Sequence, residues 1–116
     1  MKLLVVGSRG IAEFPLEEYV PKETEWIISG GANGVDTLAE KYADEHKLSK
    51  LILRPKYDRY GKAAPLKRNE EMVELCDEVL VVWDGVSRGT KYTIDYTKRK
   101  NKPLRVVIFE NGADKL

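Results

Sequence analysis

Residues 29–36, SGGANGVD, place three glycines, an asparagine and an aspartate where a buried strand should lead into a helix. Glycine allows backbone N–H groups to approach a ligand closely, and the N-terminus of the following helix adds the positive end of its dipole. The pattern therefore favours a site for an anion, most simply a phosphate. The alternative is a tight turn that only packs the helix against the sheet.

Three other connections have the same character: GSRG at residues 7–10, RPKYDRYGKAAPLKR at 54–68 and WDGVSRGT at 83–90. If the strands before them are parallel, their carboxyl ends meet at one edge, where ligands bind in open α/β sheets. For Thr90, a simple helix N-cap is the alternative. The ligand-binding candidates from these loops are Gly7, Ser8, Arg9, Gly30, Gly31, Ala32, Gly34, Asp36, Lys62, Arg68, Asp84, Gly85, Ser87, Arg88, Gly89 and Thr90.

The loop at residues 54–68 is strongly basic, with six lysines and arginines against the single acid Asp58. We expect it to form a flexible flap over an anionic ligand, in which Tyr57 and Tyr60 could stack on a base. A solvated loop with incidental charge is the alternative. A second basic cluster, at residues 98–102, falls at a helix C-terminus, where it compensates the helix dipole; contact with nucleic acid is the alternative there.

Carboxylates are the acid–base candidates on the predicted ligand edge. Asp36 and Asp84 lie in the loops, and Asp95 lies one or two turns into the last helix, so a catalytic pair among them is an open alternative. No Ser-His-Asp or Cys-His arrangement can be assembled, and His46 is interpreted as structural. One histidine and one cysteine do not make a usual zinc site, so we expect neither a metal nor a cofactor apart from the ligand.

Short apolar runs at residues 3–6, 26–28, 79–83 and 104–109, with a weaker one at 51–53, predict the strands that carry these loops. None alternates with period two, which is typical of strands buried on both faces of a parallel sheet.

Helical spacing begins at Val35, and a second helix is expected to start at Pro65 and to bury Met72, Val73 and Cys76. Residues 90–100 are ambiguous in pattern but must cross the sheet if the last two strands are parallel, so we predict a helix there. A shorter helix is expected within residues 14–20, and residues 110–116 are expected to form a short, frayed tail.

These elements predict a single domain over residues 1–116. Its fold class is α/β: a three-layer α/β/α Rossmann-like fold with a five-stranded, mostly parallel sheet in the order 3-2-1-4-5. A formal charge of +1 gives no bulk field for duplex DNA or an acidic membrane, so nucleic acid is not an expected partner. No apolar run approaches the length that spans a bilayer, and the first strand leaves no room for a signal peptide, so we expect a cytoplasmic protein.

Several blocks resemble the YspA-like branch of the SLOG superfamily. The resemblance runs over nearly the whole chain, from GSR and SGGANGVD through AEKYA, and is most specific at GKAAPLKRNEEM and DGVSRGT. It implies a Rossmann-like domain related to the LOG cytokinin-activating phosphoribohydrolases and to DprA. It also implies that the chain binds nucleotides or nucleotide-derived signals and assembles as a homo-oligomer.

The LOG enzymes cleave the N-glycosidic bond of a nucleoside monophosphate with an arginine and with the glutamate of a PGGxGTxxE motif. The resemblance implies Arg68 as the catalytic arginine and adds Asn69 to the ligand-binding candidates. The glutamate position, however, falls on Thr93, and a threonine cannot stabilise an oxocarbenium ion or activate water as a carboxylate does. Asp36, Asp84 or Asp95 could act as the catalytic carboxylate by a different geometry.

The leading interpretation is a module that binds or senses a small nucleotide or nucleotide derivative. In this interpretation the phosphate lies between the helix N-termini after Gly34 and Gly89 and contacts Ser8, Arg9 and Arg68, and the ribose lies near Asp36 or Asp84. The first alternative is a hydrolase of the N-glycosidic bond or a phosphate bond of that ligand. A second alternative, implied by the resemblance to DprA, is binding of single-stranded nucleic acid.

Overall fold

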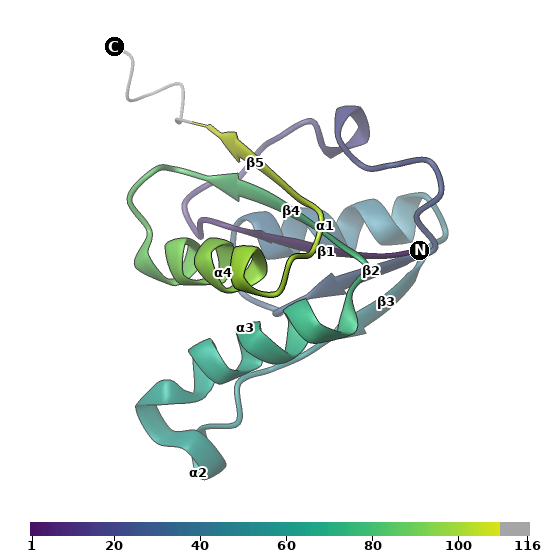
Figure 1. Ribbon diagram of the computed structural model, residues 1–116. Helices are drawn as coiled ribbons and strands as arrows, with labels where there is room; N and C mark the ends of the chain where they lie inside the picture. The colour runs from purple at the N-terminus through teal and green to yellow at the C-terminus, as the bar shows by residue number, and fades with distance from the viewer. Residues whose placement is uncertain (110–116) are drawn as a thin grey trace.

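Five parallel strands form the centre of the computed structural model, which describes residues 1–109 (Figure 1). The sheet order β3-β2-β1-β4-β5 confirms the predicted topology, and every pairing is parallel rather than only most of them. The predicted tail at residues 110–116 lies outside the described residues. The strands are β1 (Lys2–Gly7), β2 (Trp26–Ser29), β3 (Ser49–Ile52), β4 (Glu78–Trp83) and β5 (Leu104–Ile108).

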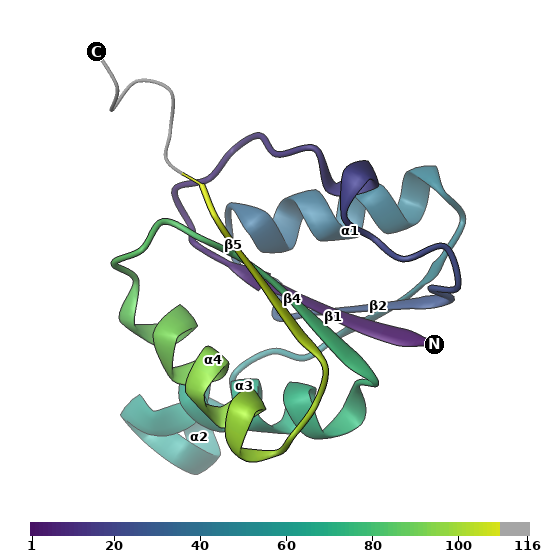
Figure 2. The same cartoon turned by 45° about the horizontal axis from the view of Figure 1, so that its top comes forward.

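Three long helices cover the two faces of this sheet (Figure 2). Helix α1 (Val35–Glu45) lies on one face, and α3 (Ala64–Leu75) and α4 (Arg88–Arg99) lie together on the other. A short helix, α2 (Tyr57–Tyr60), and a 3₁₀ turn, η2 (Gly61–Ala63), precede α3. The ambiguous segment at residues 90–100 is thus helical, as the crossover between parallel strands requires.

The prediction of a helix within residues 14–20 is wrong in its length. Only one 3₁₀ turn forms there, η1 (Leu16–Glu18), in which the N–H of Tyr19 bonds the carbonyl of Leu16. The segment lies between Pro15 and Pro21 and is too short to repay the cost of nucleating an α-helix. Its role is to bring Leu16 into the core below α1.

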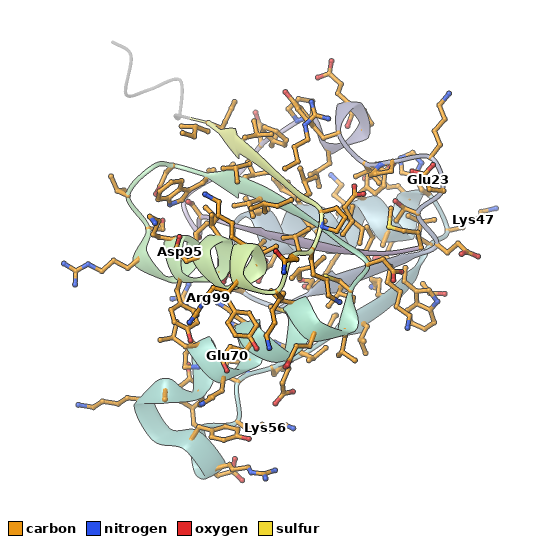
Figure 3. The ribbon with its side chains drawn as sticks, viewed as in Figure 1. Glu23, Lys47, Lys56, Glu70, Asp95 and Arg99 are labelled. Atoms are coloured by element: carbon orange, nitrogen blue, oxygen red, sulfur yellow. The ribbon has the colours of Figure 1, made fainter. Side chains whose placement is uncertain are left out.

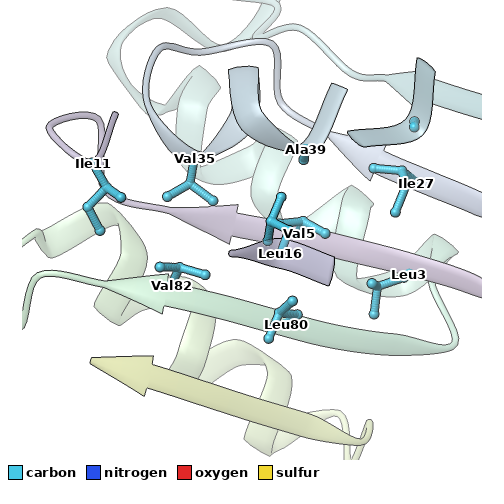
Figure 4. Packing of buried hydrophobic residues seen from close by; sticks show 10 residues of the cluster. Leu3, Val5, Ile11, Leu16, Ile27, Val35, Ala39, Leu80 and Val82 are labelled. Atoms are coloured by element: carbon cyan, nitrogen blue, oxygen red, sulfur yellow. The ribbon is translucent and has the colours of Figure 1, made fainter. Parts of the chain in front are cut away.

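Apolar side chains fill both layers between sheet and helices. On the α1 face, Val5, Ile27 and Val82 pack against Val35 and Ala39 (Figure 4). The opposite layer joins the alternate residues of β1 and β4 to α3 and α4, and it buries Met72, Val73 and Cys76, as predicted. Because both sides of each central strand meet a helix layer, these strands need apolar residues at consecutive positions.

The register of β1 and β4 fixes where the loops emerge. Gly7 pairs with Val82 at the carboxyl end of both strands, and the next N–H, that of Ser8, donates to the carbonyl of Val82 at 3.1 Å. A side chain at Gly7 would collide with this carbonyl and with Val35, at 2.2 Å and 2.5 Å from the added Cβ. The missing Cβ lets α1 pack closely at the end of the strands, where the candidate site begins.

Candidate functional site

A cleft of about 330 Å³ opens at the carboxyl ends of β1 and β4. The loops after β1, β2 and β4 line it together with the first turns of α3 and α4. The sheet order reverses at this point, since β1 continues to β2 on one side while β4 lies on the other. Eleven sequence-predicted site residues line the cleft: Gly7, Ser8, Arg9, Ala32, Asp36, Arg68, Asn69, Asp84, Ser87, Gly89 and Thr90.

The remaining predicted site residues do not line the cleft. Gly34 has a φ of 73° and packs on backbone, since an added Cβ would lie 2.4 Å from the carbonyl oxygens of Ser8 and Arg9. Gly30 and Gly31 lie behind arginine side chains. The predicted residues that fall outside the lining are Gly30, Gly31, Gly34, Lys62, Gly85 and Arg88.

The basic loop at residues 54–68 contributes to the cleft mainly through its last residues. Its middle part forms α2 and η2, which extend away from the sheet beneath α3 (Figure 1). Neither Tyr57 nor Tyr60 lines the cleft, so the structure does not place a basic flap with stacking tyrosines over it. Pro65 and Leu66, at the start of α3, do line it beside Arg68.

Arg68 is a half-buried cation in the wall of the cleft. Its Nη1 donates to the carbonyl oxygens of Gly30 at 2.7 Å and Leu53 at 3.3 Å, and its Nε donates to Asn69 Oδ1 at 2.7 Å. Among the described residues no carboxylate oxygen lies within ion-pairing distance of it. Burial lowers the pKa of the guanidinium, and the nearby Asp36 opposes that shift. Neutral acceptors therefore hold the cation in place, and the nearby Asp36 carboxylate acts on its charge without forming a direct ion pair.

Asp36 lies on the first turn of α1 and faces the same cleft while only 5% exposed. Its Oδ2 accepts a 3.1 Å hydrogen bond from the N–H of Ala32. Its Oδ1 is buried without a partner among the described residues. Burial raises the pKa of this carboxyl above its ordinary value, against the hydrogen bond from Ala32 and the charge of Arg68.

The pKa of Asp84 is displaced in the opposite direction, to below its ordinary value. Its Oδ1 accepts hydrogen bonds of 2.9 Å from the N–H groups of Val86 and Ser87 and from the Ser87 hydroxyl. Burial alone would raise the pKa of Asp84, but these hydrogen bonds outweigh it and hold the pKa below the ordinary value. Ser8 joins the cluster, since its Oγ accepts from the Asp84 N–H at 2.9 Å and lies 3.0 Å from the Oγ of Ser87. Asp84 therefore fixes the loop that leads into α4.

The N-terminus of α4 opens into the cleft. Ser87 is the N-cap, so the alternative role of Thr90 as the N-cap is wrong, and Thr90 lies in the first turn. The Ser87 side chain makes no capping bond because its hydroxyl is engaged by Asp84 and Ser8. The first-turn N–H groups of a helix have no acceptor within it, so those of Arg88, Gly89 and Thr90 remain available to a ligand. A Cβ added at Gly89 would meet nothing within 4 Å, so there is open space beside this residue of the cleft lining.

Thr93, the position that the resemblance assigned to a glutamate, is fully buried. Its hydroxyl accepts from the Asn69 side-chain amide at 2.9 Å and donates to the Gly89 carbonyl at 3.1 Å. Asn69 in turn holds Arg68. This chain of hydrogen bonds connects α3 to the first turn of α4, so Thr93 and Asn69 act on the cleft by holding its walls.

The basic cluster at residues 98–102 lies at the far end of α4. Lys102 Nζ donates to the carbonyl oxygens of Glu74 and Cys76, at 3.1 Å and 2.6 Å, and so satisfies the C-terminus of α3. Figure 3 shows Arg99 on α4 close to Glu70 of α3, while Lys56 lies near α2. His46 is exposed and stacks on Tyr42 with ring centroids 4.1 Å apart, a local packing contact.

Sequence reasoning missed four lining residues, Val6, Gly10, Pro65 and Leu66. Pro65 and Leu66 could have been inferred, because a proline at a helix start marks the edge on which that helix begins. Nothing in the sequence pattern marks Val6 as a site residue, because it lies in an ordinary apolar strand segment. Its position at the cleft follows only from the register of the sheet.

Residues 1–109 contain no helix long and apolar enough to cross a membrane, and no group of three or more His, Cys, Asp or Glu side chains that could hold a metal ion. No family model, no curated protein and no solved structure matches this chain.

Proposed function

We propose that this protein binds a nucleotide or a nucleotide-derived phosphoanion in the cleft between β1 and β4. The observation that carries the proposal is Arg68, a half-buried cation in the cleft wall with no carboxylate partner among the described residues. A buried charge is costly unless it is paired, so an anionic ligand would complete the site. The likeness of GKAAPLKRNEEM and DGVSRGT to the YspA-like SLOG branch supports the same ligand class.

The N-terminus of α4 supports the position of the phosphate. The first-turn N–H groups of Gly89 and Thr90 have no acceptor within the helix, and together with the positive end of the helix dipole they favour a phosphate there. The cleft volume of about 330 Å³ lies at the lower end of the range for small-molecule sites, and it suits a mononucleotide better than a polymer.

Replacement of Gly89 tests the proposal, because a side chain there enters open space. Gly89→Asp places a carboxylate in front of the helix N-terminus and should abolish binding of AMP and inorganic phosphate, while Gly89→Asn, its neutral isostere, should retain at least part of it. Binding is measured by calorimetry and by the rise in melting temperature, with adenosine as the ligand that lacks phosphate. Failure of every phosphorylated compound in a panel of mononucleotides and dinucleotides to bind the unaltered protein would contradict the proposal.

A hydrolase is the second candidate function, and it has its own observation. Asp36 and Asp84 line one cleft with pKa values displaced in opposite directions, and the raised pKa of Asp36 makes it the candidate for proton exchange. In this alternative Asp36 exchanges a proton with the reacting group, and the ionised Asp84 holds the loop. Chromatography of nucleotides incubated with the protein should reveal a free base or inorganic phosphate that disappears in Asp36→Asn. Stabilisation by a nucleotide without any product would exclude the hydrolase for that nucleotide.

A further inference from the structure

The cleft contains an acceptor that its own residues leave unsatisfied. Asp36 is 5% exposed, lines the cleft, and has one carboxylate oxygen, Oδ1, without a partner among the described residues. A buried polar atom that lacks a hydrogen bond destabilises the protein, so such an atom on a residue that lines the cleft marks a place for a missing partner. The partner must come from the ligand or from water.

The neighbouring cation does not fill this role. Arg68 is turned to the Gly30 and Leu53 carbonyl oxygens and to Asn69, and it forms no ion pair with Asp36. Both groups border the space over Gly30, since a Cβ there would lie 2.6 Å from Arg68 Nη1 and 3.0 Å from Asp36 Oδ2, so they are neighbours that make no direct ion pair. Two adjacent subsites of different character result: within residues 1–109, one holds a cation that makes no direct ion pair, and the other holds an acceptor without a hydrogen bond.

A carboxylate oxygen repels a phosphate and accepts from a neutral donor. We propose that a sugar hydroxyl of a phosphorylated ligand donates to Asp36 Oδ1, so that the cleft selects ribonucleotides and ribose phosphates over their deoxy counterparts. This inference rests on the proposed function, because it assumes that the phosphate of the same ligand occupies the N-terminus of α4. It adds a specificity-determining residue and narrows the ligand to one with a free sugar hydroxyl.

Matched ligands test this selection in the unaltered protein. Calorimetry compares AMP with its 2′-deoxy and 3′-deoxy forms, and ribose 5-phosphate with 2-deoxyribose 5-phosphate. Loss of the hydroxyl that meets Asp36 should weaken binding at least about tenfold, because a hydrogen bond to a charged group is lost and a buried acceptor remains unpaired. Equal affinities across both series would overturn the inference and indicate that water occupies Oδ1.

The variant Asp36→Asn tests whether Asp36 is the residue that causes the preference for ribose over deoxyribose. Its amide oxygen can still accept from the Ala32 N–H, while an NH₂ group replaces Oδ1 and cannot accept from a hydroxyl. We expect this variant to bind AMP and the relevant deoxy form within about twofold of each other and to retain affinity for inorganic phosphate. A ribose preference that survives in Asp36→Asn would assign the selection elsewhere and overturn the inference.

The two proposals fail in different ways. Binding of inorganic phosphate or deoxy-AMP without any ribose preference leaves the phosphoanion site standing and removes the hydroxyl subsite. Binding of none of these probes to the unaltered protein overturns the proposed function, and the hydroxyl subsite with it.

Discussion

Arg68 Nη1 donates a 2.7 Å hydrogen bond to the carbonyl oxygen of Gly30, which ties the first turns of α3 to the loop after β2. These two residues are distant in sequence, and the bond turns a surface arginine into a fixed wall of the cleft. Gly30 has no Cβ to obstruct the approach. The arginine is thereby held beside Asp36 without forming an ion pair with it, and its charge remains available to a ligand.

Gly30→Ala should displace this arginine. The added Cβ would lie 2.6 Å from Nη1 and 2.8 Å from Cζ of Arg68, so the guanidinium must leave the Gly30 carbonyl. Because the obstructing group is the end of a long side chain, we expect only about 1 kcal/mol of destabilisation, but at least a tenfold loss of AMP affinity. Denaturant unfolding and calorimetry measure the two effects. Unchanged affinity would show that Arg68 does not contact the ligand.

Gly34→Ala, in contrast to Gly30→Ala, should cause a large loss of stability. The residue has a φ of 73°, and a Cβ would lie 2.4 Å from the backbone oxygens of Ser8 and Arg9, which cannot swing aside. We expect destabilisation of about 3 kcal/mol or more, seen as a lower melting temperature. Gly89→Ala is the control, since its Cβ meets open space, and it should change stability by less than about 1 kcal/mol. Similar losses in both variants would contradict the steric argument.

Asp36→Asn should stabilise the ligand-free protein at neutral pH. Burial raises the pKa of Asp36 in the folded state, so between its unfolded and folded pKa values the folded protein binds more protons, and the free energy of unfolding falls as the pH rises. Above that window the ionised carboxylate costs stability that a neutral amide does not. The melting temperature of the variant should therefore exceed that of the unaltered protein at pH 7, and the difference should shrink on acidification. A less stable variant at pH 7 would contradict this assignment.

Asp84→Ala should destabilise the loop before α4. The substitution removes the acceptor of the N–H groups of Val86 and Ser87, a loss comparable to that of a helix cap, about 1 kcal/mol. Because the folded pKa of Asp84 is lowered, its contribution is present above the unfolded pKa and is lost as the pH falls through the folded pKa. The stability difference should thus vanish in acid. Asp84→Asn, which keeps one acceptor oxygen, should lose less, and a pH-independent difference would be inconsistent with this role.

Cys76 should resist thiol reagents in the folded protein. It is 2% exposed, its Sγ lies 3.2 Å from the Val73 carbonyl oxygen, and burial raises the pKa of the thiol to about 11. The reactive thiolate is therefore scarce at pH 8. Labelling should be slow without denaturant and rapid after unfolding. Fast, complete labelling of the folded protein would show that the C-terminus of α3 opens readily.

The sequence alone determined the sheet and its order. Uninterrupted apolar runs indicate strands covered on both faces, and a chain of this length can join such strands in parallel only through helices that cross the sheet. The glycine-rich and basic connections were therefore assigned to one edge correctly, and most of the predicted lining residues line the cleft. These properties depend on local composition and on chain connectivity, both of which a sequence records.

Only the tertiary structure decided what each of those residues does. Asp36 and Asp84 are both loop carboxylates in the sequence. Within residues 1–109, one oxygen of Asp36 has no hydrogen-bond partner, whereas Asp84 Oδ1 accepts three hydrogen bonds from its own loop. Gly30 and Gly34 look alike in SGGANGVD. The missing Cβ of Gly30 makes room for the Arg68 side chain, whereas that of Gly34 makes room for the backbone of the loop after β1. Burial and hydrogen-bond partners arise from segments far apart in the chain, so the charge state and the availability of each group follow from packing rather than from residue type.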